Sequence, residues 1–345
     1  MAEQTRIAIV GWGNIGRGVR ESIRNNPDMN LKAIFTRDPA RVSGEFRKER
    51  GEGPMIINAN IDSNDEWKLM QYVVDVAILC GGSKKDLPAQ GPMFARHFNT
   101  VDSFDTHTDI PAYFAKMDEV ARDSSHVSVV SAGWDPGTFS VERVMADAIL
   151  PGSKPYAFYG LQDEGGLSMG HSEALRTLEG VADARQYTHS NAAAIKRARS
   201  GETDKLTAGD RMWRECFVVL ETDNPAERQR VEPEVRGMPT YYKPYKTTVD
   251  FVTGMELARI DKERGMCHDG LVVAVGETGR KNRAVIEYAN TWESNPEGTG
   301  NILVACARAC YRMRKEGKVG AFTMADIPPA YYSSRSRAEL LKDFM

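Results

Sequence analysis

Short runs of mostly apolar residues recur in the first part of the chain, and segments with helical spacing separate most of them. The runs, which lie between residues 6 and 133, are RIAIV, LKAIFT, VDVAILC, NTVDSF and VSVVSAG. Runs of this length are typical of strands that are buried on both faces, as in a parallel sheet covered by helices. The alternation therefore predicts right-handed βαβ units and a doubly wound α/β sheet.

The pattern changes near residue 150. The later strand-like runs alternate apolar and polar positions: ADARQYTHS, WRECFVVLET, KTTVDFVTG, LVVAVGET and RAVIEYANTW. Such alternation indicates strands with one buried face, so we expect a second α+β domain with a mixed, mostly antiparallel sheet. A long amphipathic helix is predicted over 295–317, and we expect it to return to the first domain. The predicted domains are residues 1–133, completed by about 295–345, and residues 134–294.

Two segments outside this pattern also lead to predictions. Residues 37–60 are polar and punctuated by glycine and proline, so we expect an irregular surface excursion there. The basic segment SSRSRAELLKDF is predicted to be a solvated terminal helix.

Composition and charge are those of an ordinary globular protein. The 345 residues are 41% hydrophobic and 27% charged, with a formal net charge of −3. This charge gives no reason to expect nucleic acid or an anionic membrane as a partner. No apolar run reaches the ~20 residues needed to cross a bilayer, and the N-terminal residues lack the pattern of a cleavable signal. We therefore expect a mature, cytoplasmic protein.

The cysteines favour neither a disulfide framework nor a zinc site, and we expect no bound metal. Cys80, Cys216, Cys267, Cys306 and Cys310 are odd in number and scattered, without a C-x-x-C pair. The last two are four residues apart within a helical pattern, which favours core packing.

A glycine motif follows the first predicted strand and opens a helix. In it, Gly11 allows a tight turn, Gly13 lets a pyrophosphate approach the backbone, and Gly16 lets helix and strand pack closely. The helix N-terminus then presents N–H groups to the phosphates. We interpret the motif as a Rossmann-type dinucleotide site rather than a merely structural turn. Its candidate cofactor-binding residues are Gly11, Trp12, Gly13, Asn14, Ile15 and Gly16.

The end of the second predicted strand favours NADP(H) over NAD. Thr36 and Arg37 stand where an NAD site usually has an acid, and a hydroxyl and a guanidinium suit a 2′-phosphate. Asp38 opposes this assignment, because it could repel the phosphate or pair with Arg37. Arg41 could compensate for it.

Small residues follow the next strong strand. Loops at the carboxyl ends of parallel strands line the ligand crevice, so the candidates there are Cys80, Gly81 and Ser83. The adjacent lysines, Lys84 and Lys85, are interpreted as solvated.

Two acids, Asp105 and Asp135, follow the strands NTVDSF and VSVVSAG. In a doubly wound sheet both strand ends open onto the crevice that holds the cofactor. Converging carboxylates there could bind a cationic group such as an ammonium. The alternative is that each acid caps the helix that follows it, since aspartate is a favoured N-cap residue.

Several stretches resemble the meso-diaminopimelate D-dehydrogenase family, in the family's order and over nearly the whole chain. They are AIVGWGNIGR, NPDMNLKAIFTR, TVDSFDTHTDIP, VSAGWDPGTFS, GLSMGHSEALR, QYTHS, GMCHDG, SNPEGTG and GAFTMADIPPAYY. The resemblance implies an NADP-dependent, cytoplasmic, homodimeric enzyme of lysine and diaminopimelate metabolism. Its reaction is the reversible oxidative deamination of the D-centre of meso-2,6-diaminopimelate to L-2-amino-6-oxopimelate and ammonia. Residues 134–294 would bind substrate and form the dimer.

The resemblance also implies roles for individual residues. Asp105 and Asp135 would bind the D-centre ammonium, and either could relay its proton. Trp134 and Tyr159 would wall the pocket, and the backbone at Met169 and Gly170 would hold the D-centre carboxylate. The distal L-centre would be recognised by Thr188, Arg214, His268 and Asn295. The residues expected along the cofactor are Pro136, Gly137, Thr138 and Phe139.

Taken by themselves, some of these residues have simpler interpretations. Arg214 lies among apolar neighbours, where a carboxylate pair is plausible, but it could be an exposed strand arginine. His268 lies in an adaptable loop and could be merely solvated, and His171 could help to cap a helix. The chain departs from the family pattern at 161–166, at 37–60 and at Asp38. The rival functions are another NADP-linked two-domain reductase, such as a dihydrodipicolinate-type enzyme, and a non-catalytic NADP-binding sensor.

Overall fold

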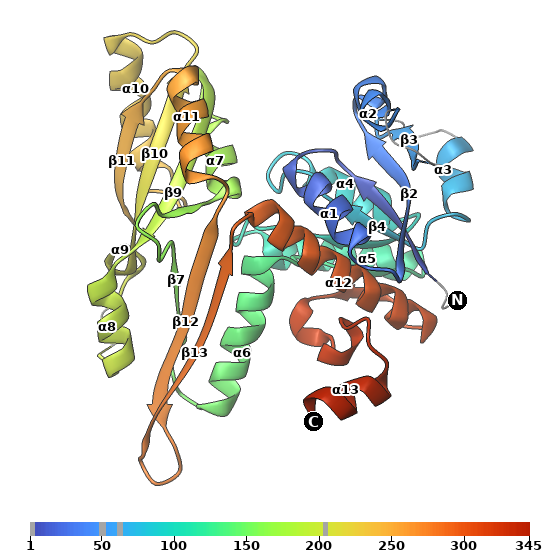
Figure 1. The fold of residues 1–345 in the computed structure, drawn as a ribbon. Helices are drawn as coiled ribbons and strands as arrows, with labels where there is room; N and C mark the ends of the chain where they lie inside the picture. Colours follow the sequence, from blue (N-terminus) through green and yellow to red (C-terminus); the bar gives the residue numbers. More distant parts are fainter. Residues whose placement is uncertain (1–3, 48–52, 61–64, 203–205) are drawn as a thin grey trace. The chain divides into compact units, whose positions relative to one another are not determined.

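The computed structural model describes residues 4–47, 53–60, 65–202 and 206–345 of the chain. The chain forms two compact units, one of residues 1–141 with 296–345 and the other of residues 142–295. The sheets of both units can be followed in Figure 1.

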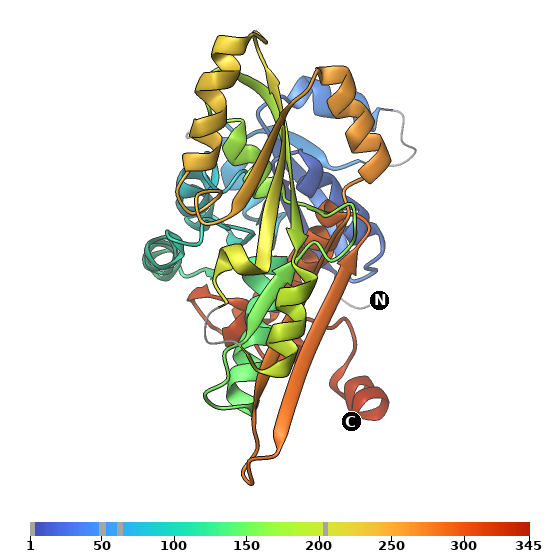
Figure 2. The ribbon, with the colours of Figure 1, turned by 90° about the vertical axis from the view of Figure 1, so that its left-hand side faces the viewer.

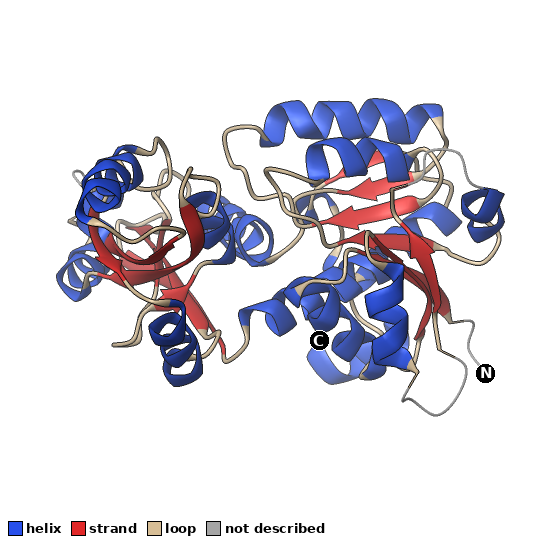
Figure 3. Ribbon diagram, turned by 90° about the horizontal axis from the view of Figure 1, so that it is seen from above, coloured by secondary structure: helices blue, strands red, loops and turns tan. Residues whose placement is uncertain are grey.

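The first unit is built on a seven-stranded sheet with the order β14-β6-β5-β4-β1-β2-β3. Every neighbouring pair in it is parallel. The strands are β1 (Thr5–Val10), β2 (Met29–Thr36), β3 (Met55–Asn58), β4 (Val76–Leu79), β5 (Asn99–Asp102), β6 (Val127–Val129) and β14 (Gly320–Phe322). Helices lie on both sides of this sheet (Figure 3), so its central strands β4 and β5 are buried at every position.

The helices of this unit are α1 (Asn14–Arg24), α2 (Pro39–Phe46), α3 (Asp65–Met70), α4 (Leu87–Ala95), α5 (Ile110–Asp123), α12 (Asn295–Lys315) and α13 (Arg337–Phe344), with α6 (Phe139–Ile149) leading into the second unit. Helices α1 and α12 approach each other closely because both carry glycine there. A Cβ at Gly18 would lie 2.3 Å from the Pro296 carbonyl oxygen. Cys306 and Cys310 of α12 are fully buried, as the helical pattern predicted.

The prediction that residues 37–60 form an irregular excursion is wrong. Helix α2 and strand β3 occupy the described parts of this segment. Strand β3 pairs with β2 from Ala33 opposite Met55 to Thr36 opposite Asn58. The sequence signal is weak for a physical reason: α2 buries only Val42, and β3 is an edge strand with one fully buried residue.

The second unit contains two sheets. The four-stranded sheet has the order β11-β10-β9-β8, and the three-stranded sheet the order β13-β12-β7. All pairs are antiparallel except β10 with β11, so the predicted fold class is confirmed for both sheets. Figure 2 shows β12 and β13 as a long hairpin. The strands are β7 (Tyr156–Tyr159), β8 (Gly166–Leu167), β9 (Val181–Ser190), β10 (Met212–Leu220), β11 (Lys246–Phe251), β12 (His268–Glu277) and β13 (Arg283–Trp292).

Besides most of α6, the described part of this unit contains the helices α7 (Met169–Leu175), α8 (Ala192–Ser200), α9 (Ala208–Arg211), α10 (Pro225–Gly237) and α11 (Gly254–Arg264). Back in the first unit, the terminal helix α13 buries none of its residues, as predicted. Among the described residues, no helix combines the length and the apolar character that a membrane crossing requires.

Candidate active site

The glycine loop after β1 has the geometry that phosphate binding requires. Gly11 has φ +98°, and a Cβ at Gly16 would lie 2.2 Å from the Gly11 carbonyl oxygen. A Cβ at Gly13 would meet no described atom within 4 Å, so the backbone there is open to a ligand. Gly13 is also the N-cap of α1 and provides no side-chain cap, which leaves N–H groups of the first turn for a phosphate.

The side chain of Trp12 contacts two residues of α2. Its indole Nε1 donates to Glu45 Oε2 at 2.8 Å, and its ring centroid lies 5.3 Å from that of Phe46. Arg17 and Arg41 both form ion pairs with Glu45, and these pairs keep the pKa of Glu45 below its usual range. The glycine loop and α2 are thus held together by one polar cluster. Asn14 and Ile15 are the first two residues of α1.

The acid that opposed the NADP assignment is engaged elsewhere. Asp38 caps α2, where its Oδ1 accepts from the Arg41 backbone N–H at 3.0 Å, and it lies 3.7 Å from the Arg41 guanidinium. Arg37 pairs with Asp86 at 3.3 Å, and its side chain remains 68% exposed. Thr36 is buried and its hydroxyl accepts from the Asp38 N–H. Two arginines, Arg37 and Arg41, therefore lie at the start of α2 beyond the end of β2.

The loop after β4 supports the loop that carries Asp105. The Ser83 hydroxyl donates to the Ser103 carbonyl oxygen at 3.4 Å and accepts from the Asp105 N–H at 3.1 Å. Cys80 is buried in the sheet, which raises the pKa of its thiol above the ordinary value. A Cβ at Gly11 would lie 3.3 Å from the backbone of Cys80. Gly81 follows Cys80 directly in this loop.

Asp105 precedes the N-cap of the next helix, and Asp135 lies in an irregular turn. Helix α5 starts after Asp109, and α6 starts at Phe139, after a single irregular turn over Trp134–Thr138. Burial raises the pKa of the Asp105 carboxyl, and the charge of Asp135 acts in the same direction. The hydrogen bond with Ser83 and the charge of His107 lower this pKa, but burial has the larger effect. The two carboxylates thus lie close enough to interact electrostatically. A cation near both would relieve the repulsion between them.

The residues after Asp135 fold into a compact turn. The Asp135–Pro136 peptide bond is cis, and Gly137 has φ +140°, which a side chain would disfavour. The Thr138 hydroxyl donates to the Trp134 carbonyl oxygen at 3.3 Å. Trp134 and Phe139 are both buried, with ring centroids 4.7 Å apart.

One buried acid, which the sequence did not reveal, joins the two loops. Asp102 Oδ1 accepts from the N–H groups of Phe104 and Ser131, both at 3.0 Å, and Oδ2 accepts from the Tyr113 hydroxyl at 2.9 Å. The Asp102 carbonyl oxygen also accepts from the Ala132 N–H at 2.8 Å. Burial raises the pKa of Asp102 to about 6, against the effect of the three donors. These contacts also end β5 and β6 earlier than the apolar runs predicted.

In the second unit, Arg214 and Thr188 form a buried pair. They stand opposite each other on β10 and β9, and the Arg214 guanidinium donates to the Thr188 hydroxyl oxygen. The guanidinium carbon lies 4.1 Å from the centroid of the Tyr245 ring. Because Arg214 is only 4% exposed, its interpretation as an exposed strand arginine is wrong.

His268 is likewise buried rather than solvated in a loop. It begins β12, and its Nδ1 accepts from the Asp269 N–H at 3.1 Å. A Cβ at Gly166 would lie 2.2 Å from His268 Nδ1, so this glycine makes room for the imidazole. The Tyr159 ring centroid lies 6.2 Å from that of His268.

The short strand β8 brings the predicted distal residues together. Gly166 pairs with Thr188 in the sheet and lies against His268. The carbonyl oxygen of the next residue, Leu167, accepts from Asn295 Nδ2 at 3.0 Å. Thr188, His268 and Asn295 therefore each contact this two-residue strand, and Arg214 is connected to it through Thr188. A strand of two residues is too short to show a pattern of apolar and polar positions, so it was not predicted.

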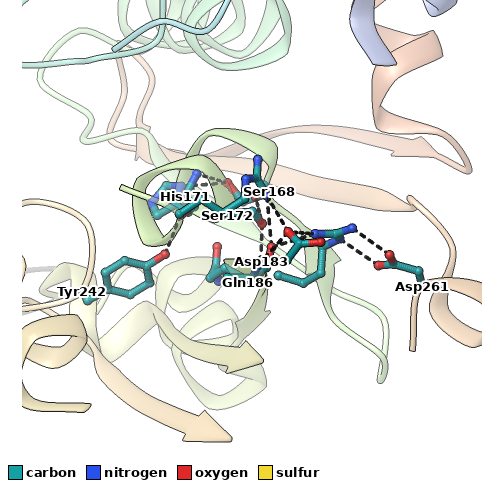
Figure 4. Close-up of polar contacts among 10 residues, drawn as sticks. Ser168, His171, Ser172, Asp183, Gln186, Tyr242 and Asp261 are labelled. Atoms are coloured by element: carbon teal, nitrogen blue, oxygen red, sulfur yellow. Dashed lines mark hydrogen bonds and ion pairs between the residues drawn. The ribbon is translucent and has the colours of Figure 1, made fainter. Parts of the chain in front are cut away.

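Helix α7 follows at once, with Met169 and Gly170 as its first two residues. Ser168 is the N-cap: its hydroxyl accepts from the His171 N–H and is also hydrogen-bonded to His171 Nδ1 at 2.7 Å, so His171 helps to hold the cap. The Ser172 hydroxyl donates to the Ser168 carbonyl oxygen at 2.6 Å, and the Tyr242 hydroxyl donates to the His171 carbonyl oxygen at 2.7 Å. Figure 4 shows these contacts around the first turn.

The turn before β8, where the chain departs from the family pattern, is anchored to the start of β12. The Leu161 N–H donates to Asp269 Oδ1 at 2.8 Å, and Gln162 Nε2 donates to Cys267 Sγ at 3.2 Å. Arg264 donates to the Glu164 carbonyl oxygen at 3.2 Å. The longer turn is therefore a fixed part of this unit. Among the residues that the structure describes, no cluster of His, Cys, Asp and Glu could hold a metal.

Comparison with known proteins decides the family. Residues 133–294 match the family model described as the diaminopimelic acid dehydrogenase C-terminal domain. The meso-diaminopimelate D-dehydrogenase of Lysinibacillus sphaericus is 45% identical over 341 residues, which is 99% of each chain. The chain belongs to the meso-diaminopimelate D-dehydrogenase family. The Corynebacterium glutamicum member is 39% identical over 97% of this chain and 98% of its own.

Solved structures of the family agree with this assignment. The C. glutamicum DAP dehydrogenase in complex with DAP superposes with a TM-score of 0.87 at 36% identity, covering 99% of both chains. An engineered D-amino acid dehydrogenase bound to NADP⁺ superposes with a TM-score of 0.86 at 35% identity, covering 99% of this chain and 100% of its own. The resemblance inferred from the sequence motifs is confirmed, and it removes the support for a reductase of another family.

Proposed function

We propose that the protein catalyses the reversible, NADP-dependent oxidative deamination of the D-centre of meso-2,6-diaminopimelate, yielding L-2-amino-6-oxopimelate and ammonia. The family assignment supports the reaction, and the relatives of known structure are described with DAP or NADP⁺ bound. The observation that carries the proposal is the buried Arg214–Thr188 pair, a preformed site for a carboxylate in the unit that the family model matches.

The ammonium of the D-centre would lie at Asp105 and Asp135. Deamination requires an unprotonated amine, so one proton must leave the ammonium before hydride transfer. The raised pKa of Asp105 suits a carboxylate that takes up this proton. Water then adds to the imine carbon, and the C–N bond breaks to release ammonia. Asp102 holds the two loops in place during these steps.

NADP(H) would accept or donate the hydride, and the described residues fit it. The first turn of α1 and the open position at Gly13 would hold the pyrophosphate. Arg37 and Arg41 would bind the 2′-phosphate. The loops at Cys80–Ser83 and Pro136–Phe139 would line the rest of the cofactor.

The two carboxylates of the substrate would be bound separately. We assign the D-centre carboxylate to the N–H groups of Met169 and Gly170 at the start of α7. We assign the distal L-centre to Thr188, Arg214, His268 and Asn295, with Tyr159 and Trp134 as aromatic walls. Binding energy from the distal groups would position the D-centre for hydride transfer.

We further propose a homodimer formed by the second unit. Val144, Met145 and Ile149 of α6 and Val285 of β13 are 54%, 47%, 55% and 39% exposed, which is unusual for apolar side chains unless they meet a partner. Sedimentation of Met145→Glu with Ile149→Glu should show monomers where the parent protein shows dimers. We also propose a cytoplasmic location, because the reaction uses the internal NADP(H) pool; cell fractionation would test this.

Turnover tests the activity. Reduction of NADP⁺ should be measured with meso-, LL- and DD-diaminopimelate and with simple D- and L-amino acids. We expect strong preference for the meso isomer and no turnover of LL-diaminopimelate, which lacks a D-centre. Binding of NADPH without turnover of any of these substrates would instead support a non-catalytic sensor.

A further inference from the structure

We propose that Gln186 is a positioning residue that fixes the direction of the Thr188 hydroxyl and thereby prepares the distal carboxylate site. This inference rests on the proposed function, because it concerns how that site holds its ligand. Gln186 lies on β9 two residues before Thr188, so both side chains extend from the same face of the strand. It is fully buried.

The hydrogen bonds at Thr188 determine where its proton can point. Gln186 Nε2 donates to Thr188 Oγ1 at 3.1 Å, and Arg214 Nη1 donates to the same oxygen. A hydroxyl oxygen has two lone pairs and one proton. With both lone pairs occupied, the proton is directed away from Gln186 and Arg214, and Thr188 can act only as a donor to a further group.

The acceptor that suits this site is an anion. Arg214 is a buried cation without an ion-pair partner among the described residues, and its Nε has no hydrogen-bond partner there. The face of Tyr245 supports the guanidinium but does not neutralise it. A carboxylate would accept from the Thr188 hydroxyl and from Arg214 together, and it would supply the missing negative charge.

The backbone of Gln186 is fixed to the other proposed carboxylate site. Its N–H donates to the Ser172 hydroxyl at 2.9 Å, and its carbonyl oxygen accepts from the Ser168 N–H at 3.0 Å (Figure 4). Ser168 and Ser172 belong to the cap and first turn of α7, which carries Met169 and Gly170. Gln186 therefore connects the start of α7, through its backbone, with Thr188, through its side chain.

Ion pairs of the preceding residue, Arg185, connect β9 to α11. Arg185 pairs with Asp261 of α11 at 2.8 Å and with Asp183 at 2.7 Å. The start of α7 and the ion pairs of Arg185 thus fix the backbone at Gln186. The point from which the Gln186 side chain extends is therefore fixed as well. The carbonyl oxygen of the Gln186 amide has no hydrogen-bond partner among the described residues.

The test is a double-mutant cycle with Gln186→Met and Thr188→Val. Methionine has a similar volume but cannot donate, so the Thr188 hydroxyl becomes free to turn toward other partners. We expect Gln186→Met to raise KM for meso-diaminopimelate about tenfold, the effect of one lost hydrogen bond to an oriented group, with kcat and KM for NADP⁺ little changed. In the Thr188→Val background the same change should raise KM less than twofold, because no hydroxyl remains to be oriented.

The matched control is Gln229→Met, on the exposed face of α10, which should change neither constant. If Gln186→Met leaves KM unchanged, or multiplies it equally in both backgrounds, the inference is wrong and Gln186 is only structural. Should the methionine variant melt at much lower temperature, Gln186→Glu replaces it; its carboxylate would pair with Arg214 and should raise KM at least as strongly. A parent protein without activity on meso-diaminopimelate would refute the proposed function instead, which separates the two failures.

Discussion

Replacing Arg214 by methionine should weaken substrate binding without weakening the fold. For binding, the variant leaves a substrate carboxylate in a buried site without its cation. Truncation of one partner of such a pair typically costs 2–5 kcal/mol. Because Thr188 remains as a donor, we expect about 3 kcal/mol, which corresponds to an increase in KM for meso-diaminopimelate of about 100-fold.

The effect on the stability of the free protein is a balance of opposing terms. The free protein loses the bond to Thr188, worth about 1 kcal/mol, and the contact with Tyr245, worth roughly 1–2 kcal/mol. It also loses a buried cation that has no ion-pair partner among the described residues, and replacing buried charges by apolar residues commonly stabilises by about 1–4 kcal/mol. These terms sum to between about 2 kcal/mol against the variant and about 2 kcal/mol in its favour, so the melting temperature should change by no more than a few degrees.

Steady-state kinetics and thermal melting distinguish this from a structural role. Arg211→Met is a matched control, since Arg211 also lies over a tyrosine, Tyr156, and donates to the Ala157 carbonyl oxygen at 2.6 Å. That variant should lose stability and keep its KM. The reasoning would be refuted if Arg214→Met melted several degrees lower while KM for meso-diaminopimelate stayed at the parent value.

Three further predictions follow from the contacts of charged residues. Arg37→Ala should raise KM for NADP⁺ about five- to tenfold with little change for NAD⁺, and adding Arg41→Ala should increase this discrimination; equal effects on both cofactors would contradict it. Asp135→Asn should lower kcat/KM for meso-diaminopimelate by about 100-fold or more at an unchanged melting temperature, and near-parent activity would contradict its role at the ammonium. Burial alone would raise the pKa of Glu215, but hydrogen bonds from His189 and Arg264 lower this pKa to about 2. The ionised Glu215 should therefore stabilise the protein by about 1–2 kcal/mol above pH 4.5, and this stabilisation should be lost progressively as the pH falls toward 2. In melting curves recorded over this pH range, Glu215→Gln should make the melting temperature depend less on pH.

The parallel sheet could be predicted because each strand carries its own signal. Runs such as RIAIV and VDVAILC are apolar at nearly every position, which reflects helices on both faces rather than any distant contact. The same logic fails for α2 and β3, which bury little. Local patterning identifies an element in proportion to the apolar surface that the element itself buries.

The residues of the candidate site also differ in how far the sequence alone predicts them. Gly11, Gly13 and Gly16 could be interpreted from spacing, because a phosphate loop is a local structure. Gly166 could not, since its importance comes from the imidazole of His268, about a hundred residues away in the chain. Gln186 was also missed, because a glutamine in an alternating strand is normally assigned to the solvated face. Its burial depends on β8 and α7 covering that part of β9.

The three acids Asp102, Asp105 and Asp135 show why residue type alone cannot assign a role. All three lie at or just after the ends of neighbouring strands, where an acid suggests ligand binding. Asp102 accepts three hydrogen bonds from the protein itself, so its acceptor capacity is largely used and it serves to fix the loops. Asp105 instead feels the charge of Asp135, an unfavourable arrangement unless a cation is bound there. The proposed roles therefore follow from the surroundings of each carboxylate: hydrogen bonds from both loops make Asp102 a structural acid, and the mutual repulsion of Asp105 and Asp135 favours a bound cation.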